Sequence, residues 1–389
     1  MYGTIRVGAA LFALSSFVVT AASAATLQVG AGKTYSTISA ASAQANDGDV
    51  IEIHPGTYRQ GAAFYDDNLT IRAAPGAAPG SVVVRGGTVQ GKALFVTKGD
   101  NITIDGIRFQ DAAVPDRNGA GIRGEGRNLT VLNSQFYNVE NGILTGGEGD
   151  DNIVTIRGSS FDLIRSPGGA GVLTHAVYIG KTIGGVVIED STFSRVTTGH
   201  YVKSRAKSTI VRRSTIDDRE GTASYLIDAA EGGQLVVEGN TLIKGANAGN
   251  PTAIAMGFEQ YKGGNFVNPP GFIFVGDNDF TNYHNGNVTF FNNRTGEPAE
   301  LHNNELTVVA GRVSLAKGEH IVTTDADHPL PIDSLPIGNP PVGDLPYRPI
   351  ADLPPLNMPG QVDDVPAPGA ALLLGLAALG LGAARRRRA

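Results

Sequence analysis

Short stretches of alternating apolar and polar residues recur along most of the chain, separated by turns that contain Gly or Asn. Asn101–Ile104 and Asn128–Val131 are two such stretches. Each is followed by a small or polar pair and then by a bulky apolar residue. The bulky residues are Phe109, Phe136, Phe161, Phe193, Ile216, Leu242, Phe280 and Leu306. Alternation with a period of two predicts strands, and a repeat in the twenties predicts that these strands belong to stacked coils.

A single coil of this kind would leave its apolar side exposed. Neighbouring coils must therefore stack at the strand spacing of about 4.8 Å and bury ladders of Phe and Ile along one axis. We expect a parallel β-helix over residues 25–325. Two long intervals in the repeat, 161–193 and 242–280, predict loops that would wall a cleft. The expected loops are Arg165–Thr174, Ala246–Pro251 and Lys262–Pro270.

The start of the repeat region has its own pattern. Thr34–Ala43 carries apolar residues at helical spacing, and the strand Val50–His54 and the turn Pro55–Tyr58 follow it. A helix there would cover the open edge of the first coil. In this order the segments resemble the right-handed parallel β-helix proteins of the pectin-lyase-like superfamily. The resemblance implies an all-β solenoid with an N-terminal cap helix, but lyases, hydrolases, epimerases and non-catalytic adhesins share that fold.

Composition narrows the class of protein further. The 389 residues include 52 Gly and 21 Pro, which favours repeated turns over helices. The formal net charge of -6 argues against nucleic acid as a partner, because that needs a cationic surface. The absence of Cys excludes disulfides and thiolate metal sites.

Both ends of the chain indicate export. Arg6, the apolar run Val7–Thr20 and the small residues Ala22–Ala24 predict a secretory signal peptide over 1–24. After the solenoid, 12 of the 21 prolines lie between Pro329 and Pro368. This composition predicts a semi-rigid spacer over 326–364.

The segment 365–389 combines a Pro motif in Val365–Ala370, an apolar stretch that continues to Ala384, and four arginines, Arg385–Arg388. It resembles the PEP-CTERM sorting signal of Gram-negative bacteria, although Ala367 stands where that family most often has Glu. The resemblance implies a membrane-inserted tail, with its arginines in the cytoplasm, that an exosortase-type protease processes. A plain anchor that stays uncut is the alternative. In either case we expect the solenoid to be exported across the inner membrane and to lie at the cell surface, in the outer envelope or in the extracellular matrix.

Candidate chemistry gathers in three segments that are 25 residues apart. They are His175–Lys181, His200–Arg205 and Tyr225–Glu231. If the coils stack in register, Val177, Val202 and Ile227 form a buried row. Alternation then sends Tyr178, Lys203 and Asp228 outward as one row, with Arg205 on the same face. His175 and His200 share the parity of the buried row but lie at the strand edge, and the sequence leaves their direction open.

These residue types suit β-elimination of a uronate-containing, acidic polysaccharide. Arg205 would neutralise the sugar carboxylate, and Lys203 would remove the proton from the neighbouring carbon. Tyr178, His175 or His200 would protonate the leaving oxygen. Tyr201, Tyr225, Asp228 and Glu231 are the expected substrate-binding residues.

Three other interpretations remain open. A glycoside hydrolase would pair Asp228 with Glu231, or with Asp217 and Asp218, and an epimerase on the same fold belongs to this alternative. A non-catalytic protein could bind or scaffold a polysaccharide matrix. Lys203 and Asp228 could also form a plain exposed ion pair, worth under about 1 kcal/mol.

Two further motifs are weaker indications of a bound ligand. Gly146–Val154 fits one copy of a calcium-binding nonapeptide, so calcium at Asp150 and Asp151, with Asp228, is the one metal we consider. No second copy follows, a plain acidic turn is the preferred interpretation, and no cofactor is required. Gly119–Gly124 matches a dinucleotide-binding string, but no helix is expected after it.

Overall fold

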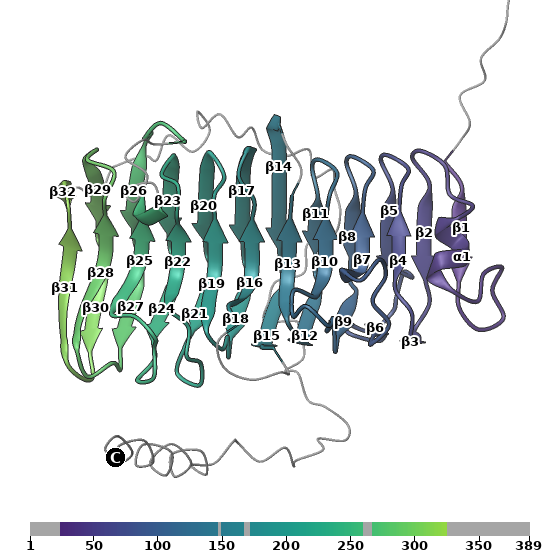
Figure 1. Ribbon diagram of the computed structural model, residues 1–389, viewed down its shortest axis with the longest axis horizontal. Helices are drawn as coiled ribbons and strands as arrows, with labels where there is room; N and C mark the ends of the chain where they lie inside the picture. The colour runs from purple at the N-terminus through teal and green to yellow at the C-terminus, as the bar shows by residue number, and fades with distance from the viewer. Residues whose placement is uncertain (1–23, 147–148, 167–171, 260–266, 325–389) are drawn as a thin grey trace, which may run out of the picture. The chain divides into compact units, whose positions relative to one another are not determined.

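The computed structural model describes residues 24–146, 149–166, 172–259 and 267–324 (Figure 1). The predicted spacer and sorting segment lie outside the described residues, as does the predicted signal peptide except for its last residue. Within the described ranges, no helix is long and apolar enough to cross a membrane.

The described strands form three long parallel sheets, which we name A, B and C. Sheet A consists of β1 (Thr26–Val29), β2 (Val50–Ile53), β5 (Thr70–Ala73), β8 (Thr103–Asp105), β11 (Thr130–Leu132), β14 (Gly149–Arg157), β17 (Ile183–Glu189), β20 (Ser208–Arg212), β23 (Gln234–Glu238), β26 (Ile273–Gly276), β29 (Ala299–His302) and β32 (His320–Thr323). Sheet B consists of β3 (Gly56–Tyr58), β6 (Val82–Arg85), β9 (Arg108–Gln110), β12 (Gln135–Val139), β15 (Ser160–Ile164), β18 (Thr192–Ser194), β21 (Thr215–Asp217), β24 (Thr241–Lys244), β27 (Asp279–Asn282) and β30 (Glu305–Val308). Sheet C consists of β4 (Ala62–Phe64), β7 (Ala93–Thr97), β10 (Ala120–Gly124), β13 (Asn141–Thr145), β16 (Thr174–Ile179), β19 (Gly199–Ser204), β22 (Tyr225–Ala229), β25 (Thr252–Met256), β28 (Asn287–Asn293) and β31 (Arg312–Lys317).

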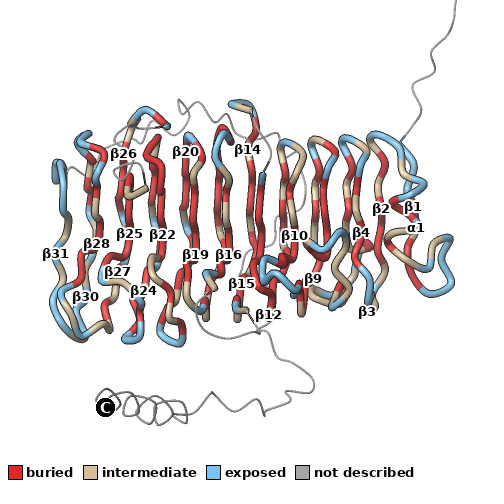
Figure 2. Tube along the Cα trace, in the orientation of Figure 1, coloured by how far each residue is buried: buried red, intermediate tan, exposed pale blue. Residues whose placement is uncertain are grey.

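The chain visits the three sheets in turn, so that each coil adds one strand to each sheet (Figure 1). The strands are mostly buried and the turns between them are exposed (Figure 2). The predicted all-β fold is confirmed, and the three parallel sheets are consistent with a right-handed parallel β-helix.

The bulky residues of the repeat form the predicted ladder inside the solenoid. Phe136 pairs in register with Phe161, and Phe193 with Ile216. Ring centroids along Phe109, Phe136, Phe161 and Phe193 are 5.0, 4.5 and 4.8 Å apart, with the rings stacked. The spacing matches the distance between neighbouring strands, so the aromatic stack and the sheets support one another.

Asparagines mark one corner of successive coils. Asn68, Asn101 and Asn128 have φ angles of 59, 58 and 56°. Their side chains are joined by hydrogen bonds of 3.0 and 2.9 Å. Asn tolerates this left-handed conformation better than most residues, which explains why it recurs there.

The dinucleotide-like string Gly119–Gly124 contains strand β10, and the next element is strand β11, so no helix follows it, as expected. A Cβ atom at Gly121 would lie 2.6 Å from Cδ1 of Phe136, inside contact distance. Glycine is therefore required there so that the strand can pass over the aromatic ladder.

One short helix, α1 (Ile38–Ser42), lies beside β1 at the N-terminal end of the sheets (Figure 1). The Thr37 side chain accepts a hydrogen bond from the Ala40 amide at 3.2 Å and so caps the helix start. Ile38 and Ala41 are buried. The helix is shorter than the predicted Thr34–Ala43, and its role as a cap of the solenoid stays a prediction.

The predicted loops fall between strands in the chain order. Arg165–Thr174 leads into β16, and Ala246–Pro251 leads into β25. Lys262–Pro270 follows β25. Residues 167–171 of the first loop and 262–266 of the last lie outside the described residues.

Candidate functional site

The predicted register over three coils of sheet C is present. Tyr178 pairs with Lys203, and Lys203 pairs with Asp228, each across one strand spacing. The inward neighbours Val177, Val202 and Ile227 are fully buried in the core. Positions 25 residues apart in the sequence are therefore neighbours along the solenoid, which brings the candidate residues together.

Lys203 is buried, with 7% of its surface exposed. Its Nζ donates to Asp228 Oδ2 at 3.0 Å and to Glu259 Oε1 at 2.7 Å. Burial opposes the charge, but the two carboxylates outweigh it and raise the pKa of Lys203. The interpretation as an exposed ion pair is wrong, and a lysine with a raised pKa is poorly suited to the base role expected for it.

Glu259 is the residue that sequence analysis missed. Its Oε2 accepts a hydrogen bond from Arg205 Nε at 2.8 Å and forms an ion pair with Nη2 at 2.7 Å, while its Oε1 accepts from Lys203. Burial raises the pKa of this carboxyl, but the hydrogen bonds and charges of Lys203 and Arg205 lower it overall. Glu259 follows β25 in an insertion, so no 25-residue offset points to it. The only signal was the long repeat interval 242–280.

Arg205 joins the two ends of the site. Besides Glu259, it donates from Nη1 to the Tyr178 hydroxyl, and its guanidinium lies 5.3 Å from the centre of the Tyr178 ring. Glu231 Oε1 lies 3.6 Å from Arg205 Nε. Burial lowers the pKa of Arg205, but Tyr178 and the carboxylates raise it overall. Arg205 thus keeps its charge at the position expected for the carboxylate-neutralising residue.

The two histidines point outward, which settles the direction that the sequence left open. The His175 ring lies 5.3 Å from the Tyr178 ring and stacks on His200 at 5.0 Å, and His200 stacks on Tyr225 at 5.1 Å. Ala176 and Val177 both pack in the core, so the strand departs from strict alternation between His175 and Tyr178. This departure puts both side chains on the outer face.

Both imidazoles are buried and neutral at pH 7. Burial, together with the charges of Lys203 and Arg205, lowers the pKa of His175 to about 3. Burial, His175 and Lys203 lower the pKa of His200 to about 2. Their Nδ1 atoms are 3.2 Å apart, which fits one nitrogen donating to the other.

Three predicted residues do not reach this face. Tyr201 is fully buried inside the solenoid, where its hydroxyl binds Asp218 Oδ1 at 3.0 Å, so the expectation that Tyr201 binds substrate is wrong. Asp218 is likewise inside, and Asp217 on sheet B binds Arg219 at the adjacent turn. Neither aspartate can partner Asp228 in hydrolysis.

Two buried carboxylate oxygens of the site have no hydrogen-bond partner among the described residues. They are Asp228 Oδ1 and Glu231 Oε2. Burial raises the pKa of Asp228 despite the nearby Lys203. Such unpaired acceptors are costly and mark places where a ligand or water can donate a hydrogen bond.

The expected calcium ligands are not gathered into one site. Asp150 pairs with Lys207 at 2.5 Å, and Asp151 pairs with Arg127 at 3.1 Å. Asp228 lies on sheet C, whereas the other two belong to β14 of sheet A. The described residues contain no group of three or more His, Asp or Glu side chains placed to hold a metal ion.

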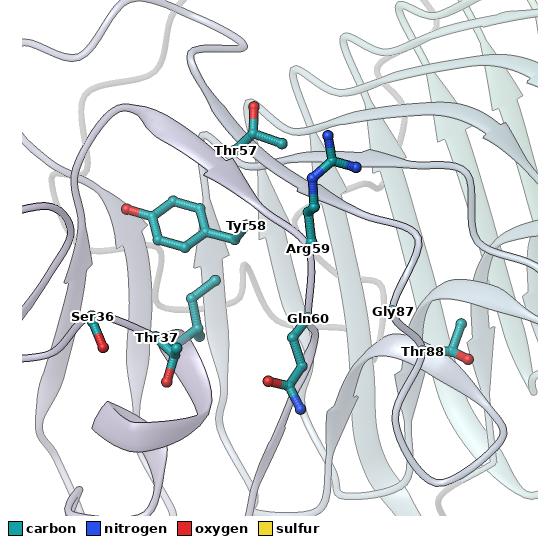
Figure 3. A pocket seen from close by; sticks show the side chains of 9 residues that line it. Ser36, Thr37, Thr57, Tyr58, Arg59, Gln60, Gly87 and Thr88 are labelled. Atoms are coloured by element: carbon teal, nitrogen blue, oxygen red, sulfur yellow. The ribbon is translucent and has the colours of Figure 1, made fainter.

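The hollows found elsewhere on the described surface bring together fewer reactive side chains than the sheet C cluster. One of about 650 Å³ lies beside α1, and its lining combines hydroxyl and amide side chains with Arg59 (Figure 3). Another of about 440 Å³ on sheet B is lined by Asp162, Arg195, Asp217 and Arg219. There each arginine already pairs with an aspartate. The sheet C cluster remains the candidate site.

Comparisons with known proteins give only distant structural likenesses. No protein-family model matches the sequence, and no match to a curated protein was found. The alginate lyase from Paenibacillus sp. is 18% identical over 76% of this chain and 99% of its own, with a TM-score of 0.44. The pectin methylesterase from Aspergillus niger is 14% identical over 72% and 88%, with a TM-score of 0.42. Pectate lyase Pel9A is 14% identical over 76% and 79%, with a TM-score of 0.41. At these values the likeness assigns no activity or residue role to this chain.

Proposed function

We propose that this chain binds an acidic polysaccharide on the outer face of sheet C and cleaves it by β-elimination. The observation that carries the proposal is the way in which Lys203 and Arg205 together hold the Glu259 carboxylate. Both oxygens of that carboxylate are bound, at 2.7 to 2.8 Å, and 32% of the Glu259 side chain is exposed. A carboxylate that arrives from solvent can therefore take its place.

A uronate held in this position meets the requirements of the reaction. The two cations offset the negative charge that develops on the sugar carboxylate when the proton leaves the neighbouring carbon. A base accepts that proton, and its electron pair forms a double bond to the next ring carbon. The bond from that carbon to the glycosidic oxygen breaks, and an acid protonates the leaving oxygen.

The geometry redistributes the roles that the sequence suggested. Lys203 serves with Arg205 as a carboxylate-binding residue, because its raised pKa keeps its proton in place. His175, already neutral, is the better candidate base, since the charge of a bound uronate would raise its pKa toward the working range. Tyr178, which contacts Arg205 and lies beside His175, is the candidate proton donor. His200 and Tyr225 extend this stack of rings, while Asp228 holds Lys203.

Hydrolysis is less well supported by this arrangement. It requires two carboxyl groups that face the scissile bond, with room between them for a sugar or a water molecule. Asp228 and Glu259 instead share the Lys203 ammonium, which fills the space between them. Epimerisation would begin with the same proton removal, and binding without cleavage would use the same two cations.

The setting of this activity rests on the sequence. Export through the segment 1–24, processing of 365–389 by an exosortase-type protease and transient membrane attachment stay predictions. We propose on that basis that the polysaccharide is met at the cell surface or in the surrounding matrix. Calcium likewise stays an expectation for which the described residues offer no assembled ligand set.

The test is to incubate the protein with a panel of acidic polysaccharides and follow two products. β-Elimination gives the ultraviolet absorbance of an unsaturated uronate, whereas hydrolysis gives reducing ends without it. Arg205→Lys should lower kcat/KM at least about a hundredfold, because a lysine cannot replace a forked guanidinium. Arg219→Lys, at the turn after β21, makes the same substitution away from sheet C and should change nothing. Reducing ends alone, binding without products, or no binding at all would each overturn the proposed lyase.

A further inference from the structure

Arg123 on β10 lies in the same outward row of sheet C as the candidate site. It pairs in register with Leu144 on β13, and Leu144 pairs with Tyr178 on β16. Arg123 is therefore two strands from Tyr178, a distance of about 10 Å at the usual strand spacing. Arg123 belongs to the dinucleotide-like string Gly119–Gly124. In the fold that string contains strand β10 of sheet C, which places Arg123 in this outward row.

No partner of the Arg123 guanidinium is found among the described residues. Its Nε is buried, and within the described part of the chain Arg123 makes no hydrogen bond and no ion pair. Other outward arginines, such as Arg157, Arg195 and Arg212, each hold a carboxylate. A half-buried guanidinium without an anion is costly, which indicates that an anion from outside the chain completes it.

Leu144 is the residue that separates Arg123 from Tyr178 in this row. It packs in an apolar cluster with Ala93, Val96 and Ala120, and Tyr178 packs against this cluster. Val96 pairs in register with Arg123 on its N-terminal side, so apolar side chains flank Arg123 on both neighbouring strands. Apolar side chains of this kind suit the carbon-bound faces of sugar rings, whereas the cations at either end suit carboxylates. The row leads from Arg123 directly to the Arg205 site, because Arg205 contacts Tyr178.

We propose that Arg123 binds a second carboxylate of the same glycan, three strand spacings or about 14 Å from Lys203, which with Arg205 holds the first uronate. The proposal rests on the function proposed above and adds a binding subsite to it. The glycan then runs along the solenoid axis, across the strands of sheet C toward the N-terminal coils. Arg123 is a positioning and specificity residue in this arrangement, since it contacts the chain away from the reacting bond.

The test measures the affinity of the full chain for oligouronates of two to six rings. In the wild type, affinity should rise about tenfold once an oligomer is long enough to reach Arg123 as well as Arg205. Arg123→Gln should remove that increase, raise KM for long oligomers about tenfold and leave kcat within twofold. Short oligomers should bind Arg123→Gln and the wild type equally, and Arg219→Gln should keep the length dependence.

The possible outcomes distinguish a failure of the Arg123 subsite from a failure of the proposed function on which it rests. If no oligouronate of any length binds the wild type, the proposed function itself fails. If the wild type binds and Arg123→Gln keeps the same increase with length, the Arg123 subsite is refuted while the function stands. A loss of affinity that is equal for all lengths would also refute the subsite, because it would indicate a general effect on the fold.

Discussion

Glu259 occupies the position in which a substrate carboxylate would be bound, and it does so from a covalently attached segment. An attached competitor lowers the apparent affinity for any free carboxylate, because each binding event must first displace it. The side chain is half-buried and lies outside the core, so changing it should leave the solenoid intact. The residue therefore offers a direct test of the carboxylate site.

We expect Glu259→Gln to bind a long oligouronate about tenfold more tightly than the wild type, since a neutral amide competes less well for Lys203 and Arg205. Isothermal titration calorimetry measures the change. Glu305→Gln, an exposed glutamate on β30, is the matched control and should leave affinity unchanged. Equal or weaker binding by Glu259→Gln would mean that Glu259 supports the site instead of blocking it.

His175 and His200 link stability to pH. Their pKa values in the folded chain, about 3 and about 2, lie below the ordinary value of 6.5. The unfolded chain therefore binds more protons below pH 6.5, so the stabilisation is complete above pH 6.5 and is lost as the pH falls toward 3. As the pH falls from 6.5 to 5, each histidine should lower the free energy of unfolding by about 1 to 2 kcal/mol, because the unfolded chain takes up a proton that the folded chain does not.

Urea unfolding at several pH values checks this expectation. The double variant His175→Gln/His200→Gln should show a flatter dependence on pH than the wild type across that range. His320→Gln, which changes an exposed histidine on β32, should keep the slope of the wild type. An unchanged slope in the double variant would mean that the two buried imidazoles are not the groups that titrate.

At the scale of elements, the phenylalanine ladder ties neighbouring coils together. Phe161 is fully buried between Phe136 and Phe193. Phe161→Ala should lower the free energy of unfolding by about 3 to 5 kcal/mol, because it leaves a cavity between two stacked rings. Phe161→Leu keeps most of the volume and should cost less than about 1.5 kcal/mol. Urea unfolding compares the two, and equal losses would contradict a packing role for the ring.

The repeat could be predicted because each coil places one bulky apolar residue at the same interior position. The position stays apolar even where Phe193 is followed by Ile216 in the next coil. The register of the site could be predicted because the coils that start at His175, His200 and Tyr225 have equal length. Equal length leaves a single way to stack them. The fold and the pairing of Lys203 with Asp228 therefore followed from spacing alone.

The remaining features of the site depend on three-dimensional detail that spacing does not carry. The outward direction of His175 arises because two consecutive residues, Ala176 and Val177, both turn inward. The pKa of Lys203 is raised because Asp228 and Glu259 together outweigh the effect of burial, and Glu259 belongs to an insertion without a period. Insertions follow no repeat, so their contacts cannot be read from one.

The whole solenoid has two different ends within the described residues. At the N-terminal end α1 packs against the first strands (Figure 1). At the other end β32 pairs only with β29 in the described part of the chain, and its Ile321 and Val322 are 58% and 55% exposed. In a stacked array, a coil with one neighbour is held by one interface, whereas a central coil is held by two.

The rate of amide hydrogen exchange should therefore differ between the terminal and the central coils. We expect the amides of β30, β31 and β32 to exchange at least about a hundredfold faster than those of β17 and β20, because local opening of a terminal coil breaks fewer contacts. The strands beside α1 should be protected better than this terminal coil, which makes them the internal comparison. Exchange of the full chain followed by mass spectrometry of its peptides gives the profile. Protection of β32 equal to that of β20 would contradict the expectation and would mean that residues after 324 cover this end.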